Sequence, residues 1–381
     1  MKKIDPTVEE AAETLGLSGV ARRRLLSGAG LVSATAAASA LLAACSDDNK
    51  ASGEKTGGGG SGAGDFPETP KWKFVFVNHV TTNPFFTATQ YGAQDACALL
   101  NCEFQWTGSK ESVVPEMVSA TNAAISAKAD GLAVAVVDKT AFKQPVDNAL
   151  NAGIPVVSYN ADGARGEPGT NRLAYIGQDL YVSGYQLGTR IAALMSGGDA
   201  VGFIATPGSL NIQPRIDGAK DAIKASGKSI NFKDVASGAE LPKELSTIDA
   251  YAQGHTGLKG MFAVDAGSTE AVGKTMAKYK LKEKGVAAGG FDLNPSTLNS
   301  IKGGSLDFTI DQQPYQQGFL PVLFLWMYKL TGGLIAPPDT NTGLLFVTKD
   351  NVDPYLTTKT RYEGSSTKQQ LLNRSGPIPH K

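Results

Sequence analysis

The stretch KFVFVNHVTTNPFFTATQYGAQDA, residues 73–96, joins an apolar run to a helical pattern through a polar turn. After its lysine, the run KFVFV is entirely aromatic or β-branched, which is typical of a short buried strand. Asn83-Pro84 marks a turn, because proline disfavours a helical conformation at the residue before it. Small residues from about Thr87 onward indicate a helix. The stretch therefore predicts a strand, a turn and a helix in succession.

Two adjacent phenylalanines, Phe85 and Phe86, occupy the turn. Neighbouring side chains on a helix or strand point in different directions, so the two rings are not expected to share one core stripe. One ring is expected to pack inward, while the other is available to something that the protein binds.

Similar apolar runs recur along the chain, and stretches with helical patterns separate them. Alternating strands and helices predict βαβ units and parallel sheets. The runs are continuously apolar, as expected for strands covered on both faces. A break near residues 175–180 predicts an α/β fold of two doubly wound parallel-sheet lobes. The predicted strands are 73–77, 131–137, 154–159, 200–206, 260–264, 285–291 and 306–310, and the predicted helices are 114–129, 141–153, 183–198, 214–227, 268–281 and 321–330.

The composition argues against several classes of function. The chain has 381 residues, with 36 basic and 36 acidic side chains, so its formal net charge gives no electrostatic case for nucleic-acid binding. It has three histidines and neither an HExxH nor a paired Cys-x-x-Cys motif, so no metal site is expected. No Gly-x-Gly-x-x-Gly motif follows the first strand, and no cofactor is expected.

Residues 1–45 have the layout of an export signal. A basic cluster, Arg22–Arg24, precedes an uncharged run of small and apolar residues that closes at Cys45. A permanent transmembrane anchor is the disfavoured alternative, because the run is rich in Ala, Ser and Gly. Residues 46–70 are rich in Gly and Ser and predict a flexible tether, and residues 363–381 are expected to be a disordered tail.

Two features of this segment resemble bacterial export motifs. The arginines resemble a twin-arginine signal, although Ala21 stands where Ser or Thr is usual. Leu42–Cys45 resembles a lipoprotein processing box, which implies that Cys45 becomes the lipidated N-terminus. The expected location is then the periplasmic or extracellular face of the cell membrane, through the lipid anchor.

The two remaining cysteines, Cys97 and Cys102, lie five residues apart. An oxidising exterior permits a disulfide between them, and two buried free thiols are the alternative. The sequence leaves both open, because it does not give the Cα separation that a disulfide requires.

Polar residues follow most of the predicted strands. Open α/β sheets bind ligands beyond the carboxyl ends of their strands, so these residues are candidates for a site. Acid and amide side chains suit a ligand with many hydroxyls, because each buried hydroxyl needs matching partners. The alternative is that these residues only cap the next helix, which is sufficient to explain the presence of Asp138. The residues are Asn78, His79, Asp138, Asn160, Thr206, Asp265, Asp292, Asp311 and Gln312.

Seven segments in order carry a family resemblance: TTNPFF, IPVVSYNAD, YIGQDLYVSGYQLG, NIQPRIDGAKDA, MFAVDAGSTEAVG, GGFD and FTIDQQPYQQG. Together they resemble type I periplasmic binding proteins of the ribose-binding class, the solute-binding components of ABC sugar importers. The resemblance covers residues 72–350. It implies two lobes, 71–178 with 312–345 and 179–311 with 346–362, joined by a three-strand hinge and closing on a ligand.

The resemblance also implies ligand contacts. Phe85 and Phe86 match aromatic positions that sandwich a sugar ring, and Asp265 stands where sugar binders commonly carry Asn. One of Gln213 and Arg215 is implied to contact ring hydroxyls, and the sequence does not choose between them. The implied ligand-binding residues are His79, Asn83, Phe85, Phe86, Asn160, Gln213, Arg215, Asp265, Asp292 and Gln312.

One position departs from the family pattern. Ribose-like proteins usually place Asp-Arg after the strand that ends at Tyr159, whereas this chain has Asn160-Ala161, with Asp162 next. The loss of both charges argues against a site identical to that for ribose. A pentose, a hexose, a polyol and a furanose-like signal molecule remain open.

The expected function is capture of a sugar or polyol by a monomeric, non-enzymatic protein. The family resemblance implies that it delivers the ligand to an ABC permease with its ATPase. One alternative is a receptor that hands the ligand-bound form to a membrane sensor. Another is a carbohydrate-active hydrolase, with Asp265 and Asp292 as its carboxylate pair.

Overall fold

The computed structural model describes residues 67–163, 169–333, 337–357 and 360–368. The predicted export signal with Cys45, nearly all of the tether, and residues 369–381 lie outside the described residues. The described chain forms two six-stranded sheets with helices packed on them.

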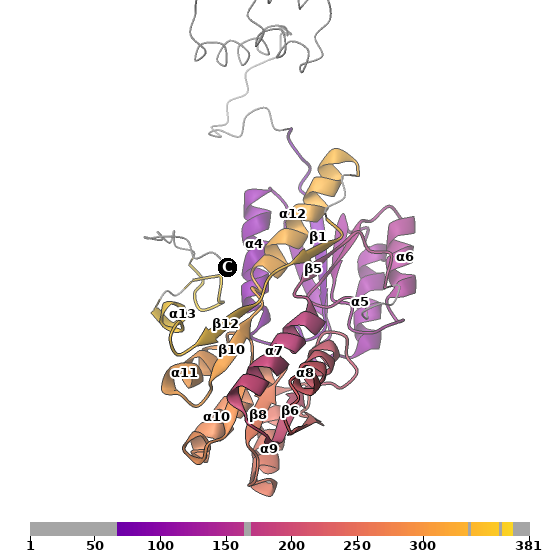
Figure 1. Cartoon of the computed structure of the whole chain (residues 1–381). Helices are drawn as coiled ribbons and strands as arrows, with labels where there is room; N and C mark the ends of the chain where they lie inside the picture. The colour runs from indigo at the N-terminus through magenta and orange to yellow at the C-terminus, as the bar shows by residue number, and fades with distance from the viewer. Residues whose placement is uncertain (1–66, 164–168, 334–336, 358–359, 369–381) are drawn as a thin grey trace, which may run out of the picture. The chain divides into compact units, whose positions relative to one another are not determined.

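The first sheet has strand order β11-β5-β4-β3-β1-β2, and each of its strand pairs is parallel. We call this sheet and its helices the first lobe; Figure 1 shows α4 and α12 side by side on it. Its strands are β1 (Lys73–Asn78), β2 (Glu103–Gly108), β3 (Gly131–Val134), β4 (Val156–Tyr159), β5 (Ala174–Gly177) and β11 (Asp339–Asn341). Its helices are α4 (Phe86–Leu99), α5 (Val114–Ser126), α6 (Lys143–Asn151) and α12 (Gln316–Thr331).

The second sheet has strand order β12-β10-β9-β8-β6-β7, and only β12 runs antiparallel, at one edge, among the described strands. We call it and its helices the second lobe. Its strands are β6 (Gly198–Ile204), β7 (Ile230–Ala236), β8 (Gly260–Ala263), β9 (Ala287–Phe291), β10 (Phe308–Asp311) and β12 (Leu345–Thr348). Its helices are α7 (Leu180–Leu194), α8 (Gln213–Ala225), α9 (Leu241–Gly254), α10 (Ala266–Lys278), α11 (Pro295–Gly303) and α13 (Asp353–Thr357), with a 3-10 turn, η2 (Lys282–Lys284).

The described chain passes between the two sheets three times, from β5 to α7, from β10 to α12 and from β11 to β12. This confirms the predicted α/β fold of two lobes with a three-strand hinge. All seven predicted strands are present, and fully buried strands such as β3 and β8 are continuously apolar. Five described strands were not predicted: β2, β5, β7, β11 and β12. Of these, the edge strands β2 and β7 have alternating or partial exposure and weak apolar runs.

Phe85 and Phe86 both belong to the hydrophobic core of the first lobe, with 8% and 2% of their surface exposed. The expectation that only one ring packs inward is therefore wrong. The stripe argument does not apply, because Phe85 lies in the turn and α4 begins only at Phe86. The turn, in which Asn83 Oδ1 accepts from the Phe85 amide at 3.0 Å, brings the two rings edge to face at 4.7 Å.

Cys97 and Cys102 are free, buried thiols at the end of α4, so the structure has the second of the two alternatives for this pair. Residues 363–368, the start of the tail expected to be disordered, lie within the described residues. Arg361 fastens this segment to α4, because its Nε donates to Asp95 Oδ2 at 3.0 Å and its guanidinium lies 4.2 Å from the centre of the Tyr91 ring.

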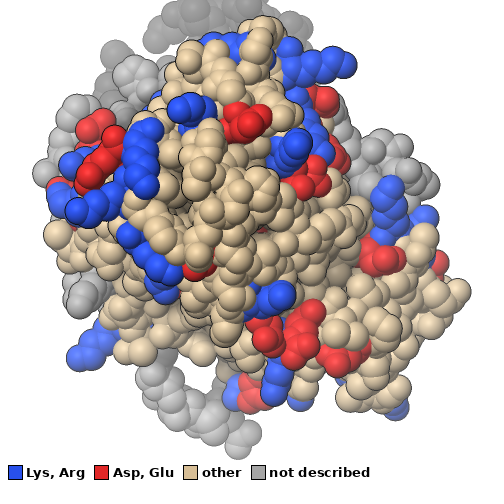
Figure 2. Space-filling view, turned by 90° about the horizontal axis from the view of Figure 1, so that it is seen from below, with Lys and Arg blue, Asp and Glu red and all other residues tan. Residues whose placement is uncertain are grey.

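Charged side chains of both signs are interspersed on the surface seen in Figure 2. Within the described ranges, no helix is long and apolar enough to cross a membrane.

Candidate functional site

Four of the residues predicted from the strand ends are buried where their strands stop. His79 follows β1, Asn160 follows β4, Asp292 follows β9 and Gln312 follows β10, and their exposed fractions lie between 2% and 5%. Polar groups are rarely buried so completely without a defined set of partners. The carboxyl ends of the sheets therefore hold a polar cluster from both lobes.

Hydrogen bonds link these residues across the hinge. Gln312 Nε2 donates to Asp292 Oδ1 at 2.7 Å, and Gln317 Nε2 donates to Gln312 Oε1 at 3.1 Å. Asn160 Nδ2 donates to Gln317 Oε1 at 3.0 Å. The chain of side chains thus runs from the first lobe, through the hinge, to a carboxylate of the second lobe.

The structure answers which of Gln213 and Arg215 points inward. Arg215 is 2% exposed, donates to Val264 O at 2.8 Å and to Gln178 Oε1 at 3.0 Å, and stacks 4.0 Å from the centre of the Phe291 ring. Gln213 instead bonds the Gly208 amide and Asp217, within its own segment. Arg215 is the member of the pair that belongs to the buried cluster.

Asp292 carries the chemistry of a hydrogen-bond acceptor held in a low-dielectric setting. Burial raises its pKa to about 7, and the Arg215 charge and the Gln312 hydrogen bond act in the opposite direction. Asp292 and Asn160 also have left-handed backbones, with φ of 77° and 61°. Apart from glycine, Asn and Asp are the residues that adopt this conformation most readily.

His79 bridges the lobes. Its Nε2 lies 3.0 Å from Nδ2 of Asn211 in the second lobe. Burial lowers its pKa to about 4, so the ring is neutral at pH 7. His79 Nδ1 and Arg215 Nε are both buried without a hydrogen-bond partner in the described structure. These two atoms can bond a ligand or water without displacing a protein contact.

Aromatic rings surround the first-lobe side of this cluster. Phe86 meets His79 edge to face at 5.3 Å and Trp106 at 5.8 Å. Trp106 and Tyr159 lie 6.3 Å apart, and the Tyr159 hydroxyl accepts from Asn78 Nδ2 at 2.9 Å. Phe86 is thus the phenylalanine whose ring contacts His79, and Phe85 packs against Phe86.

Asp265 caps a helix, α10, whereas Asp138 bonds the turn that follows it. Asp265 Oδ1 accepts from the Ser268 amide at 2.9 Å, and its Oδ2 accepts from the Ala205 amide at 3.0 Å. Asp138 Oδ1 accepts from the amides of Thr140 and Ala141 in the turn before α6, but α6 begins at Lys143 with Phe142 as its N-cap, so the expected helix cap at Asp138 is wrong. Backbone amides thus engage both oxygens of Asp265, and any ligand bond would be additional.

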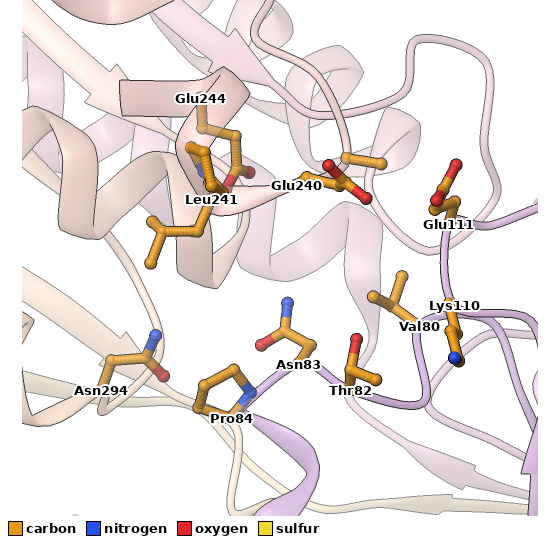
Figure 3. Close-up of a pocket in the computed structure, with 13 residues that line it drawn as sticks. Val80, Thr82, Asn83, Pro84, Lys110, Glu111, Glu240, Leu241, Glu244 and Asn294 are labelled. Carbon is orange, nitrogen blue, oxygen red and sulfur yellow. The ribbon is translucent and has the colours of Figure 1, made fainter. Parts of the chain in front are cut away.

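Asn83 lies apart from the buried cluster, on the wall of a cavity of about 370 Å³ between the lobes. Figure 3 shows it facing Leu241 and Glu244 of the second lobe. Glu244 is 3% exposed, and Ser268 Oγ donates to it at 3.2 Å.

Sequence reasoning missed Trp106, Gln178, Asn211, Glu244 and Gln317. Gln178 follows β5, so the rule on strand ends would have found it had that short strand been recognised. Trp106 lies on an edge strand, and Glu244 and Gln317 lie inside helices, where no strand-end rule applies. Their places depend on tertiary packing.

Among the described residues, no group of three or more His, Cys, Asp or Glu side chains has the arrangement of a metal site. Asp162, which follows the departure at Asn160-Ala161, pairs with Arg172 at 2.6 Å.

Comparisons with known proteins agree with this architecture. The model of the periplasmic binding protein domain matches residues 74–332. The chain is 50% identical over 315 residues to the xylose/arabinose-binding protein XylF of Sulfolobus acidocaldarius, covering 80% of this chain and 77% of the relative.

Solved structures show the same fold. A carbohydrate transporter protein from Acidothermus cellulolyticus in complex with myo-inositol is 25% identical, with a TM-score of 0.68, over 78% of this chain and 100% of the other. A solute-binding protein from Burkholderia graminis in complex with D-arabinose is 24% identical, with a TM-score of 0.68, over 75% and 98%.

Proposed function

This chain belongs to the periplasmic binding protein family, and from that membership and its buried site we propose that it captures a small sugar or polyol between its two lobes. The observation that carries the proposal is the cluster of Arg215, Asp292 and Gln312. It is buried at the strand ends, beside Phe86 and His79 of the other lobe.

The chemistry of the cluster suits hydroxyl groups. Asp292 accepts hydrogen bonds, Arg215 donates them, and Gln312 does both. Hydrogen bonds to charged groups contribute about 1.5–3 kcal/mol each, which is enough to orient a neutral ring. Phe86 and Trp106 offer apolar surface to the C–H face of a sugar.

A pentose is the first ligand to test. The relative with 50% identity is named for xylose and arabinose binding. A neighbour with 25% identity was solved with myo-inositol, a cyclic polyol of similar hydroxyl density. Closure of the two lobes on the ligand is the motion described for binding proteins of this kind.

Delivery to a membrane importer completes the proposed function. We infer that the ligand-bound form passes its sugar to an ABC permease with its ATPase. Family membership supports this inference, because it implies an exported protein. The proposed lipid anchor at Cys45 would keep it at the membrane surface, after export by the twin-arginine route. Cys45→Ala should then appear in the soluble fraction, and continued attachment to membranes would contradict lipidation.

The proposal is of a binding protein rather than an enzyme, and the family and the 50% identical relative are both binding proteins. Turnover of a bound sugar by the wild type, abolished in Asp292→Asn, would favour the hydrolase alternative instead.

A thermal-shift screen tests the proposal. Xylose, arabinose, other sugars and polyols are each added at a large excess, and the melting temperature is measured. A ligand at 100 times its Kd adds about 2.7 kcal/mol to the unfolding free energy. If no sugar or polyol raises the melting temperature while another class of compound does, the proposed function is wrong.

A further inference from the structure

The cavity of about 370 Å³ beside Asn83 is not part of the buried polar cluster. Of the ten ligand-binding residues expected from the sequence, only Asn83 lines it. His79, Arg215 and Asp292, which form the cluster, are absent from its walls. The volume falls in the range of about 300–1,000 Å³ that is typical of small-molecule sites.

Both lobes shape the cavity, and its walls are of mixed character. Val80 and Pro84 of the first lobe and Leu241 of the second give it apolar surface. Figure 3 shows Leu241 directed into the space above Asn83 and Pro84. Apolar faces with a few polar groups between them are the surroundings that sugar rings take in proteins.

Asn83 offers a donor to this space. Its Oδ1 is engaged by the Phe85 amide at 3.0 Å, which fixes the orientation of the side chain. Its Nδ2 is directed toward the second-lobe wall in Figure 3. The hydroxyl of Thr82 lies beside it on the same wall.

Glu244 offers a second, unusual polar group. A Cβ on Gly267 would lie 1.8 Å from Glu244 Oε2, so only glycine there lets the carboxyl rest against the start of α10. Burial, and then the charge and hydrogen bond of Asp265, raise the Glu244 pKa to about 9. Glu270 acts in the same direction. At pH 7 the carboxyl is therefore neutral, and a protonated carboxyl both donates and accepts.

The charges around the cavity do not favour a cationic ligand. Glu111 and Glu240 line it, but both are exposed and Lys110 lies on the same wall. The buried acid, Glu244, is the neutral one at pH 7. Neutral donors and acceptors next to apolar surface suit hydroxyl groups better than an ammonium group.

We propose that this cavity is a second subsite, which holds a sugar ring linked to the ring bound by the buried cluster. The ligands of the protein then include disaccharides as well as free pentoses. The inference rests on the proposed function, since it needs the first ring in the cluster of Arg215, Asp292 and Gln312.

Calorimetric titration with D-xylose and with xylobiose tests the subsite. We expect the wild type to bind both. Leu241→Trp fills the cavity, so its affinity for xylobiose should fall by about tenfold or more, while its affinity for xylose stays within about twofold. Ala239→Phe, on the same wall, should have the same effect by a second route. Leu99→Trp is the matched control, because Leu99 lies on α4 and is 73% exposed. This variant should leave both affinities unchanged.

Each other outcome has a defined meaning. If the wild type binds xylose but not xylobiose, the subsite is wrong and the proposed function stands. If both filling variants weaken xylose and xylobiose equally while their melting temperatures match the wild type, the cavity holds the first ring and the inference is overturned. If neither xylobiose nor any free sugar binds, the proposed function itself fails.

Discussion

The two lobes contribute different chemistry to the same site. The first lobe presents rings and neutral polar groups: Phe86 and Trp106 belong to or pack against its core, and His79 is neutral. The second lobe presents ionisable groups, Arg215 and Asp292, held on α8 and after β9. One side offers apolar area and the other offers directional, charged hydrogen bonds.

This difference separates two properties that a binding site needs. The rings of the first lobe also stabilise its core, so a change there alters stability together with binding. Arg215 and Asp292 of the second lobe are buried and their charges interact, so a change there is expected to alter affinity most. The predictions below test this division.

The largest effect on stability is expected from Phe86→Ala. Phe86 is 2% exposed in the first-lobe core, and truncating a buried phenylalanine costs about 3–5 kcal/mol. Denaturant unfolding measures it. Leu99→Ala on the same helix is the control. Its unfolding free energy should fall by about 0.5 kcal/mol or less, because Leu99 is exposed. A loss of sugar affinity in Phe86→Ala without a loss of stability would contradict the double role of this ring.

The largest effect on affinity is expected from Arg215→Met. The change removes two hydrogen bonds and leaves the Asp292 carboxylate buried without its counter-charge. Losing a charged donor that bonds the ligand costs about 1.5–3 kcal/mol, so xylose affinity should fall by roughly 30-fold or more. Arg190→Met, on α7 of the same lobe, should bind xylose normally, since Arg190 lies near the Phe308 and Phe346 rings instead. An unchanged xylose affinity in Arg215→Met would contradict the proposed role of the second lobe in sugar binding.

Asp292 predicts a pH dependence of stability. Its pKa in the folded protein is about 7, above its ordinary value, so the folded state holds this proton more tightly than the unfolded state. Its contribution to stability is complete at low pH and is lost as the pH rises from about 4 through 7. His79, with its pKa lowered to about 4, acts in the opposite direction over much of the same range.

The comparison with Asp292→Asn isolates this effect. The difference in unfolding free energy between wild type and variant should shift against the wild type as the pH rises from 4 to 8. Unfolding titrations at several pH values measure it. A difference that is constant with pH would mean that the Asp292 pKa is not raised.

The smallest effect is expected from Asn211→Ala, which removes the bond to His79 between the lobes. A single neutral hydrogen bond contributes about 0.5–1.5 kcal/mol, so xylose affinity should fall by up to about tenfold. Asn231→Ala, whose bond to Asp199 lies on the surface, is the control. A loss above 100-fold in Asn211→Ala would mean that this residue contacts the ligand directly.

The fold was predictable because buried parallel strands leave a strong local signal. Continuous apolar runs such as 131–137 and 260–264 need no tertiary information to be recognised. The edge strands β2 and β7 carry a weak signal, because only part of each is buried. Prediction failed at Phe85 and Phe86 because the path of a turn, unlike the period of a helix, depends on the packing around it.

The candidate site was predictable where residues stand at strand ends. His79, Asn160, Asp292 and Gln312 lie where the rule places them. The rule also selected Asp265, which is a helix cap. Gln213 was predicted from the family pattern instead, and its side chain bonds Asp217 on its own helix. Gln317 and Glu244 reach the site from inside helices, so their positions follow from how those helices dock and from no local pattern.

Titration calorimetry of the purified protein with D-xylose, run beside Arg215→Met, tests the central claim most directly. Capture of a small sugar by the buried cluster predicts saturable binding to one site per chain in the wild type. It also predicts an affinity lower by about 30-fold or more in the variant. The account is contradicted if xylose, arabinose and the other sugars and polyols give no heat of binding, or if wild type and Arg215→Met bind them equally well.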